Sequence, residues 1–203
     1  MTTLSSALSA LDLPLALEEN LRNFSALFMR WNRSINLSGA RDDEALDLHI
    51  IDSLHVIPHL RAVTADAALA PTSPRVLDVG SGGGLPSVVA ALALPSIHIT
   101  ALEPVRKKHA FLRTAARELD LANFEPLPER LEDHPRRDYD AATSRATFDL
   151  REWLDLGARF VRPGGLVLGF EAVPRLDLPT EVARTSYFLG DRKRSIVAFV
   201  RPP

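Results

Sequence analysis

A short glycine-rich stretch, Asp78–Pro86, combines residue types that could hold a nucleotide-like cofactor. An apolar run, Val76–Val79, leads into it, so we expect a buried strand, a tight loop and then a helix. Glycines let the backbone approach a ligand closely, and Pro86 suits the first turn of a helix, where its missing N–H has no partner. Such a turn is where α/β proteins hold a nucleotide.

Three cofactor classes compete for this loop. The phosphate loop of nucleotide hydrolases needs Gly-x-x-x-x-Gly-Lys-Ser/Thr, which the chain does not contain. The dinucleotide fingerprint Gly-x-Gly-x-x-Gly matches Gly80 and Gly82 but fails at Leu85. The series Asp78-x-Gly80-x-Gly82-x-Gly84 instead resembles the first motif of the class I S-adenosylmethionine-dependent methyltransferases.

A second carboxylate is expected at the end of the following strand. Glu103 comes directly after the apolar run 97–102, about 20 residues beyond the loop, where it could accept hydrogen bonds from ribose hydroxyls. This position supports a nucleoside ligand but does not separate NAD from S-adenosylmethionine. A plain glycine turn with a surface glutamate is the structural alternative.

Composition excludes several kinds of chemistry. The 203 residues include no cysteine, which excludes disulfides, cysteine-ligated zinc or iron–sulfur centres and a cysteine nucleophile. The formal charge of −2 gives no overall preference for polyanions, so contact with a nucleic acid must use local basic clusters. Such clusters occur at Arg30/Arg33/Arg41, Arg106–Lys108, Arg136–Arg137 and Arg192–Arg194.

The chain is expected to be cytoplasmic, monomeric and without membrane contact. No apolar run approaches the roughly 18 residues of a membrane span, and the N-terminus lacks the positive region that opens a signal peptide. His55 and His59 have a spacing found in metal sites, but no glutamate stands beside them and a proline lies between them. No metal site is expected.

Absent motifs narrow the methyl acceptor. Methylation at carbon 5 of a pyrimidine usually needs a cysteine, and the chain has none. Enzymes that methylate the amino group of adenine usually carry Asn/Asp-Pro-Pro-Tyr/Phe after the fourth strand, where this chain has Ser144-Arg145-Ala146.

A wider set of motifs lies in one order between about residues 28 and 165: Trp31-Asn32, Asn36-Leu37-Ser38, Arg41-Asp42, His49-x-x-Asp52-Ser53-Leu54, Asp78–Pro86, Phe111-Leu112 and Ser144-Arg145-Ala146. This set resembles the bacterial small-subunit ribosomal RNA guanine-N7 methyltransferase family, once called glucose-inhibited division protein B. The resemblance implies methyl transfer from S-adenosylmethionine to N7 of a guanosine in 16S ribosomal RNA, with the RNA or a 30S particle as partner.

The first motif and the resemblance together imply cofactor contacts at Asp78, Gly80, Gly82, Leu85, Glu103, Leu131, Glu132 and Arg145. Arg145 is also the expected catalytic residue, because it follows the fourth strand and stays protonated, so it can orient cofactor or RNA. A surface salt bridge is its structural alternative. The chain departs from the family in two places: Phe170-Glu171, where lysine followed by glycine is common, and Thr147, where phenylalanine is frequent.

Other polar residues allow two interpretations. His49, Asp52 and Ser53 share a helix face and could pack the N-terminal helices against the mouth of the pocket, or form a buried hydrogen-bond cluster. Asn36 and Ser38 could reach cofactor or RNA, or only form a turn. The alternative functions are methylation of another RNA or a small molecule, and a non-catalytic S-adenosylmethionine-binding ribosome-assembly factor.

Secondary-structure elements must position these residues, and hydrophobic periodicity predicts that the elements form two parts of the chain. Residues 1–65 form a helical cap, with a loop near 32–41, and residues 66–203 form one compact methyltransferase domain. Alternating strands and helices predict an α/β fold with a seven-stranded, mostly parallel sheet, a reversed last strand and helices on both faces. The expected strands are 76–79, 97–102, 124–127, 139–143, 166–170, 187–189 and 195–200, and the expected later helices are 86–94, 105–119 and 148–161.

Overall fold

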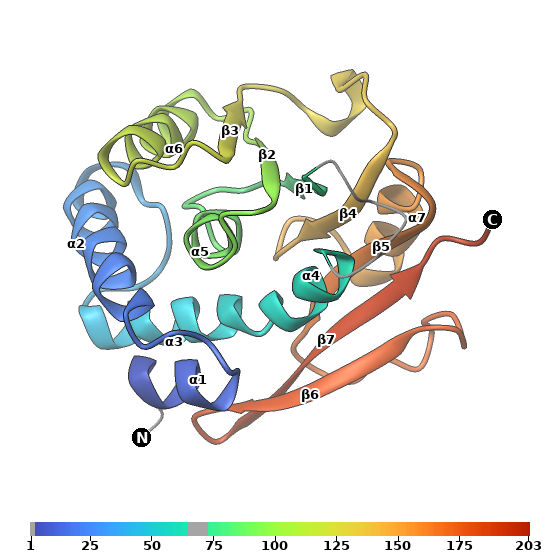
Figure 1. Cartoon of the computed structure of the whole chain (residues 1–203), viewed down its shortest axis with the longest axis horizontal. Coiled ribbons are helices and arrows are strands. Elements are labelled where there is room, and N and C mark those ends of the chain that lie inside the picture. Colours follow the sequence, from blue (N-terminus) through green and yellow to red (C-terminus); the bar gives the residue numbers. More distant parts are fainter. Residues whose placement is uncertain (1–2, 65–72) are drawn as a thin grey trace.

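The chain folds around a single mixed sheet. A computed structural model describes residues 3–64 and 73–203. The strand order is β3-β2-β1-β4-β5-β7-β6 (Figure 1), and the first five strands are parallel while β7 runs antiparallel to both of its neighbours. The strands are β1 (Arg75–Val79), β2 (His98–Leu102), β3 (Phe124–Leu127), β4 (Tyr139–Ser144), β5 (Val161–Glu171), β6 (Ala183–Leu189) and β7 (Arg192–Val200). The expected sheet with its reversed last strand is confirmed.

Side chains alternate between the two faces of the sheet, as the pleat requires. Val76, Ile99 and Ala141 belong to a core shared with the helices that precede β3, whereas Leu77 and Ala142 belong to a second core. The first face is covered by α5 (Ser87–Ala93) and α6 (Arg106–Glu118). The second is covered by α7 (Leu150–Gly157) and the short 3-10 helix η2 (Leu131–Asp133).

The N-terminal helices extend the first core. They are α1 (Leu4–Ala10), α2 (Leu17–Ile35), α3 (Asp43–Leu54) and α4 (Ile57–Thr64). Phe24 and Phe28 on α2 stack edge-on and pack with Phe111 of α6, with the rings of Phe28 and Phe111 5.7 Å apart. Figure 1 shows α2 and α3 beside α5, and α3 also contacts β6 of the β6–β7 hairpin. The predicted boundary at 65/66 lies outside the described residues.

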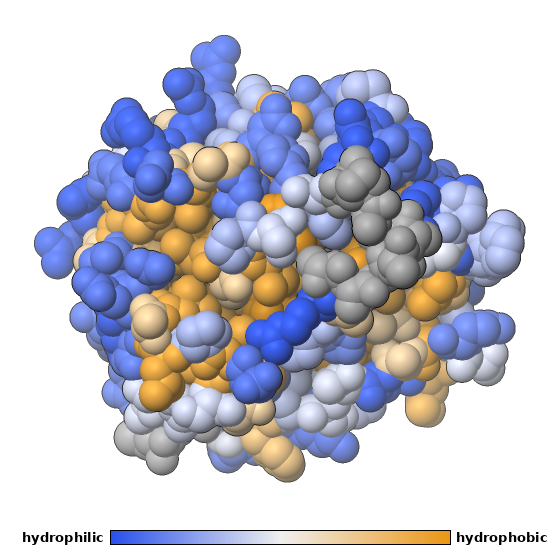
Figure 2. Space-filling model, in the orientation of Figure 1, coloured by the Kyte–Doolittle hydropathy of each residue, from blue (hydrophilic) through white to orange (hydrophobic). Residues whose placement is uncertain are grey.

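This shared core reaches the surface on one face of the molecule. Figure 2 shows apolar residues exposed in the area that lies between α2 and α5 in Figure 1, with hydrophilic residues around them. Within the described residues, no helix is long and apolar enough to cross a membrane.

One predicted segment differs from the structure. Helix 148–161 was expected to end at a turn through Pro163-Gly164-Gly165, but α7 ends at Gly157 and β5 already begins at Val161. The proline and glycines form a bulge within β5, where the register with β4 jumps from Tyr139↔Val161 to Ala141↔Leu166. Pairing continues because Gly164 N–H donates to the Arg201 carbonyl and Arg201 N–H donates to the Gly165 carbonyl, each at 2.9 Å.

Candidate active site

The glycine loop lies between β1 and α5, at the carboxyl edge of the sheet. Gly80, Gly82 and Gly84 all have positive φ, between 55° and 75°, a conformation that other residues adopt only at a cost. At Gly80 space is also limiting, since a Cβ there would lie 2.3 Å from the Thr147 hydroxyl oxygen. The loop therefore brings its backbone against the segment that follows β4.

Asp78 is a buried acid directly behind this loop. Its side chain is almost inaccessible, and among the described residues neither carboxylate oxygen accepts a hydrogen bond. Burial raises the pKa of Asp78 from 3.8 to about 6, opposed by the nearby hydroxyls of Ser81 and Ser87. The loop thus has an unpaired negative charge behind it whenever Asp78 is ionised.

This raised pKa predicts a pH dependence of stability. Between pH 4 and 6 the folded protein binds more protons at Asp78 than the unfolded chain, so the free energy of unfolding falls as pH rises. The shift corresponds to about 3 kcal/mol. Asp78→Asn should remove this fall, which urea unfolding of both proteins at pH 4 and pH 7 would measure. Equal pH dependence in variant and wild type would contradict the assignment.

Glu103 fixes the loop from the end of β2. It is 4% exposed, and its carboxylate accepts hydrogen bonds from the backbone N–H groups of Gly82 and Val105, both at 2.8 Å. A carboxylate has about four lone-pair directions, so capacity for further acceptance remains. Glu103 does not itself line the neighbouring cavity, although Leu102 and Pro104 on either side of it do.

Three adjoining cavities follow the carboxyl ends of the strands. The first, of about 190 Å³, lies between the glycine loop and η2, and the second, of about 350 Å³, lies on the other side of Gly80. Gly80 and Thr147 line both. The third, of about 700 Å³, lies between α3 and the β6–β7 turn and shares His49, Arg145 and Ala146 with the second.

The structure places most predicted site residues on these walls. Leu131 and Glu132 line the first cavity, and Gly82, Leu85 and Arg145 line the second. Ser38 also lines the second cavity. Asn36 ends α2 in a left-handed conformation. Several lining residues gave no signal in the sequence, namely Phe148, Leu189 and Asp191, and Lys108 was marked only as part of a basic cluster.

Arg145 stands where the second and third cavities meet. Its Nε lies 3.0 Å from Asp52 Oδ2, and its Nη2 donates to His49 Nδ1 at 2.9 Å. Burial, together with the charge of Arg145, lowers the pKa of His49, so the ring is neutral near pH 7 and its Nδ1 can accept this bond. The Arg145 side chain is only 17% exposed, so the surface salt bridge weighed above does not describe it.

A second layer of contacts holds Asp52 in place. Tyr187 of β6 donates its hydroxyl hydrogen to Asp52 Oδ1 at 2.7 Å, and the pKa of Tyr187 is raised by burial and by the charge of Asp52. The Tyr187 ring stacks on His55 at 3.6 Å between centroids. The face His49–Ser53 therefore does both things considered above, since it forms a buried hydrogen-bond cluster and also joins α3 to the cavity wall. Among the described residues, no group of three His, Asp or Glu side chains could hold a metal.

The two departures from the family pattern have separate structural roles. Glu171 is buried and faces away from the cavities, where its Oε2 lies 3.0 Å from Arg184 Nε and its Oε1 accepts the Arg175 N–H at 2.9 Å. Phe170, by contrast, lines the third cavity, with its ring 5.7 Å from the Arg145 guanidinium. Thr147 fills the space opposite Gly80.

Solved structures show the same fold. Magnesium protoporphyrin IX methyltransferase from Synechocystis PCC 6803 superposes with a TM-score of 0.58 at 13% identity, covering 88% of this chain and 97% of that one. A methyltransferase from Geobacter sulfurreducens gives a TM-score of 0.56 at 17% identity, covering 89% of each chain. These likenesses confirm the class I methyltransferase fold.

Sequence relatives are closer. The ribosomal RNA small subunit methyltransferase G of Aromatoleum aromaticum is 40% identical over 190 residues, covering 90% of this chain and 84% of the relative. That of Burkholderia ambifaria is 39% identical over 185 residues, covering 87% and 76%. The family model described as rRNA small subunit methyltransferase G matches residues 17–200. The resemblance seen in the sequence is thereby confirmed, and the chain belongs to the rRNA small subunit methyltransferase G family.

Proposed function

We propose that the protein transfers the methyl group of S-adenosylmethionine to N7 of a guanosine in 16S ribosomal RNA. The observation that carries the proposal is the row of three adjoining cavities, with Arg145 at the junction of the last two. The cofactor fits along the first two, and the third is left for the acceptor base. Family membership supplies the class of acceptor.

The residues around the first two cavities suit this cofactor. The adenine would lie between Leu102 and the η2 residues Leu131 and Glu132, where apolar side chains and backbone groups meet. Glu103 would accept from the ribose hydroxyls while it holds the loop at Gly82.

The methionine end would follow the glycine loop past Gly80, Gly82 and Leu85 toward Arg145. The buried charge of Asp78 behind the loop favours a cationic sulfonium in front of it. S-adenosylmethionine brings an activated methyl group, and the protein then has to hold the two reactants in line.

The chemistry of guanine N7 matches what the walls offer. This nitrogen has an exposed lone pair and carries no proton, so no general base is required. His49 is neutral and already accepts a hydrogen bond from Arg145, so it is not placed as a base. The fixed positive charge of Arg145 can orient the cofactor carboxylate or an RNA phosphate beside the methyl group.

The partner is proposed to be 16S RNA or a 30S assembly particle, and the protein is proposed to act as a cytoplasmic monomer. Small-subunit RNA follows from the names of the relatives, whereas the modified guanosine and N7 follow from the resemblance in the motifs.

Two measurements test the proposal. Titration calorimetry with S-adenosylmethionine and with NAD should give binding of the first only. Radiolabelled methyl transfer should label 30S particles or naked 16S RNA, and borohydride–aniline cleavage, which cuts at N7-methylguanosine, should give a single site. Label in another RNA or in small nucleophiles would replace the acceptor, and binding with no turnover on any of them would favour an assembly factor. Failure to bind S-adenosylmethionine would refute the proposal.

A further inference from the structure

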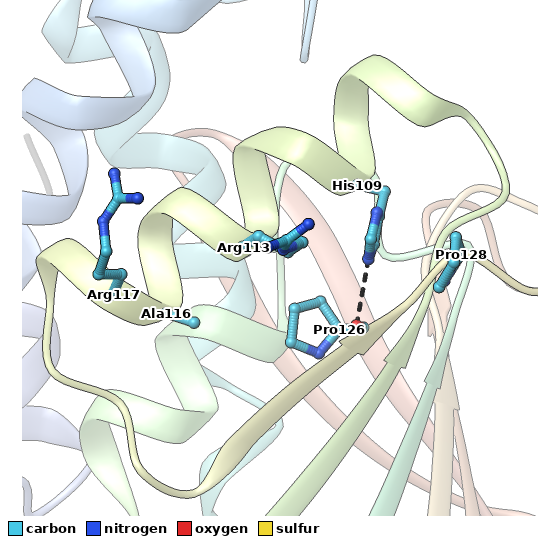
Figure 3. Close-up of a pocket in the computed structure, with 6 residues that line it drawn as sticks. All are labelled: His109, Arg113, Ala116, Arg117, Pro126 and Pro128. Atoms are coloured by element: carbon cyan, nitrogen blue, oxygen red, sulfur yellow. Dashed lines mark hydrogen bonds between the residues drawn. The ribbon is translucent and has the colours of Figure 1, made fainter.

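A groove of about 550 Å³ lies outside the three cavities, between α6 and the edge strand β3. Its lining, drawn in Figure 3, consists of His109, Arg113, Ala116, Arg117, Pro126 and Pro128. His109, Arg113, Ala116 and Arg117 share one side of α6, because Arg113 is four positions after His109, and Ala116 and Arg117 are three and four positions after Arg113. The groove is therefore a feature of one helix face and one sheet edge.

The positive charge in this groove is poorly compensated. Among the described residues, no carboxylate lies within ion-pair distance of Arg113. Arg117 has one such contact, at 3.8 Å to Glu118, whose other carboxylate oxygen is held by Arg30 at 2.7 Å. Arg106 and Lys107 add exposed charge in the first turn of α6, where the helix dipole disfavours cations. An anionic ligand would relieve this accumulation.

The groove is shaped for a chain that does not pair as a β-strand. Pro126 lies in β3 and has no N–H to offer on this outer edge, so strand addition is disfavoured. His109 Nε2 is 3.2 Å from the Pro126 carbonyl oxygen, so this backbone acceptor already has a hydrogen-bond partner (Figure 3). The remaining surface combines guanidinium groups with the apolar faces of two prolines and Ala116. In a nucleic-acid backbone, the phosphates can pair with the guanidinium groups and the riboses can pack against the prolines.

The groove also adjoins the site of methyl transfer. Lys108, next to His109 in the first turn of α6, lines the second cavity. Pro128 directly precedes Glu129, which lines the first. Along α6, the rise of about 1.5 Å per residue separates Arg113 from Arg117 by about 6 Å. An RNA strand whose base is in the third cavity could therefore continue along the carboxyl ends of the strands, past the second and first cavities, to the groove beside β3.

We propose that the α6–β3 groove binds the ribose–phosphate backbone of the RNA substrate, away from the nucleotide that is methylated. The inference rests on the proposed function, since it assigns a second contact to the same substrate. Arg113 and Arg117 act as phosphate-binding residues, and the prolines pack against the sugars. Such contacts hold and position the RNA without reading its sequence.

The test compares Arg113→Glu with Arg159→Glu, an equal charge reversal at an exposed arginine after α7, on the opposite face of the sheet. We expect Arg113→Glu to raise KM for 16S RNA or 30S particles at least about tenfold, with kcat and the affinity for S-adenosylmethionine unchanged. In filter binding, Arg113→Gln/Arg117→Gln should lower the slope of log K against log salt by about one for each lost phosphate contact. Arg159→Glu should behave as wild type.

The outcomes separate this inference from the proposed function. Suppose that the wild type methylates 16S RNA. If the groove variants then keep the wild-type KM and the wild-type salt slope, the groove assignment is overturned and the proposed function stands. An equal loss in Arg159→Glu would also overturn it, because the effect would then be one of net charge. If the wild type methylates no 16S RNA, the proposed function fails. The salt slope with 16S RNA then still decides whether the groove binds the RNA backbone.

Discussion

Replacing Arg145 by alanine is expected to lower kcat for methyl transfer by on the order of 100-fold or more, the usual cost of removing a preorganised electrostatic group from an active site. The guanidinium is held by Asp52 and His49 at the junction of the second and third cavities, where we propose that cofactor and acceptor meet. Single-turnover methylation at saturating S-adenosylmethionine measures the effect.

A second variant separates chemistry from stability. Arg145→Ala leaves Asp52 buried without its cation, which by itself destabilises the fold. In Arg145→Ala/Asp52→Asn that unpaired charge is gone and the amide oxygen can still accept from the Tyr187 hydroxyl, so thermal stability should recover while turnover stays low. Recovery of turnover in the double variant would show that Arg145 serves the fold only.

Replacing Gly80 by alanine is expected to lower the affinity for S-adenosylmethionine at least about tenfold, which corresponds to 1.4 kcal/mol. The new Cβ would lie 2.3 Å from Thr147 Oγ1, so the loop or Thr147 must shift, and both line the first two cavities. The positive φ of 71° adds about 1–2 kcal/mol of backbone cost. Titration calorimetry gives the affinity, and urea unfolding gives the stability.

Two comparisons isolate the clash. Gly190→Ala introduces the same kind of strain, at φ 64°, in a turn where no atom of the described residues lies within 4 Å of the new Cβ, so the affinity for S-adenosylmethionine should be unchanged. Adding Thr147→Ala to Gly80→Ala removes the two nearest clashing atoms, at 2.3 and 2.6 Å, and should restore part of the affinity. Wild-type affinity in Gly80→Ala would mean that the cofactor does not use this part of the loop.

Local signals predicted the parts of the fold that depend on neighbouring residues. The apolar runs predicted the positions of the seven strands, because the central parallel strands are buried on both faces and read as continuous apolar segments. The helices followed from the 3.6-residue spacing of apolar residues. The error at Pro163-Gly164-Gly165 has a non-local cause. Turn-forming residues stayed in β5 because Arg201, 36 or more positions later, completes their backbone hydrogen bonds.

In the candidate site too, local features could be predicted from the sequence and long-range contacts could not. The glycine loop and Glu103 could be found because backbone geometry at a strand end demands glycine and allows an acid. Tyr187 could not be found, because its partner Asp52 is 135 positions away and only the sheet order brings β6 beside α3. Lys108 carried only the signal of a general basic cluster.

The contacts from His55 through Tyr187 and Asp52 to Arg145 connect α3, β6 and the segment that follows β4 in one continuous network. Substitutions along such a network are not independent, since each side chain sets the position and charge state of the next. Substitutions at positions 52, 145 and 187 are therefore expected to occur together, because Asp52 is the partner of both Arg145 and Tyr187. Among the N-terminal helices, α3 is therefore more than a covering, because its Asp52 and His49 set the position of the Arg145 guanidinium between the second and third cavities.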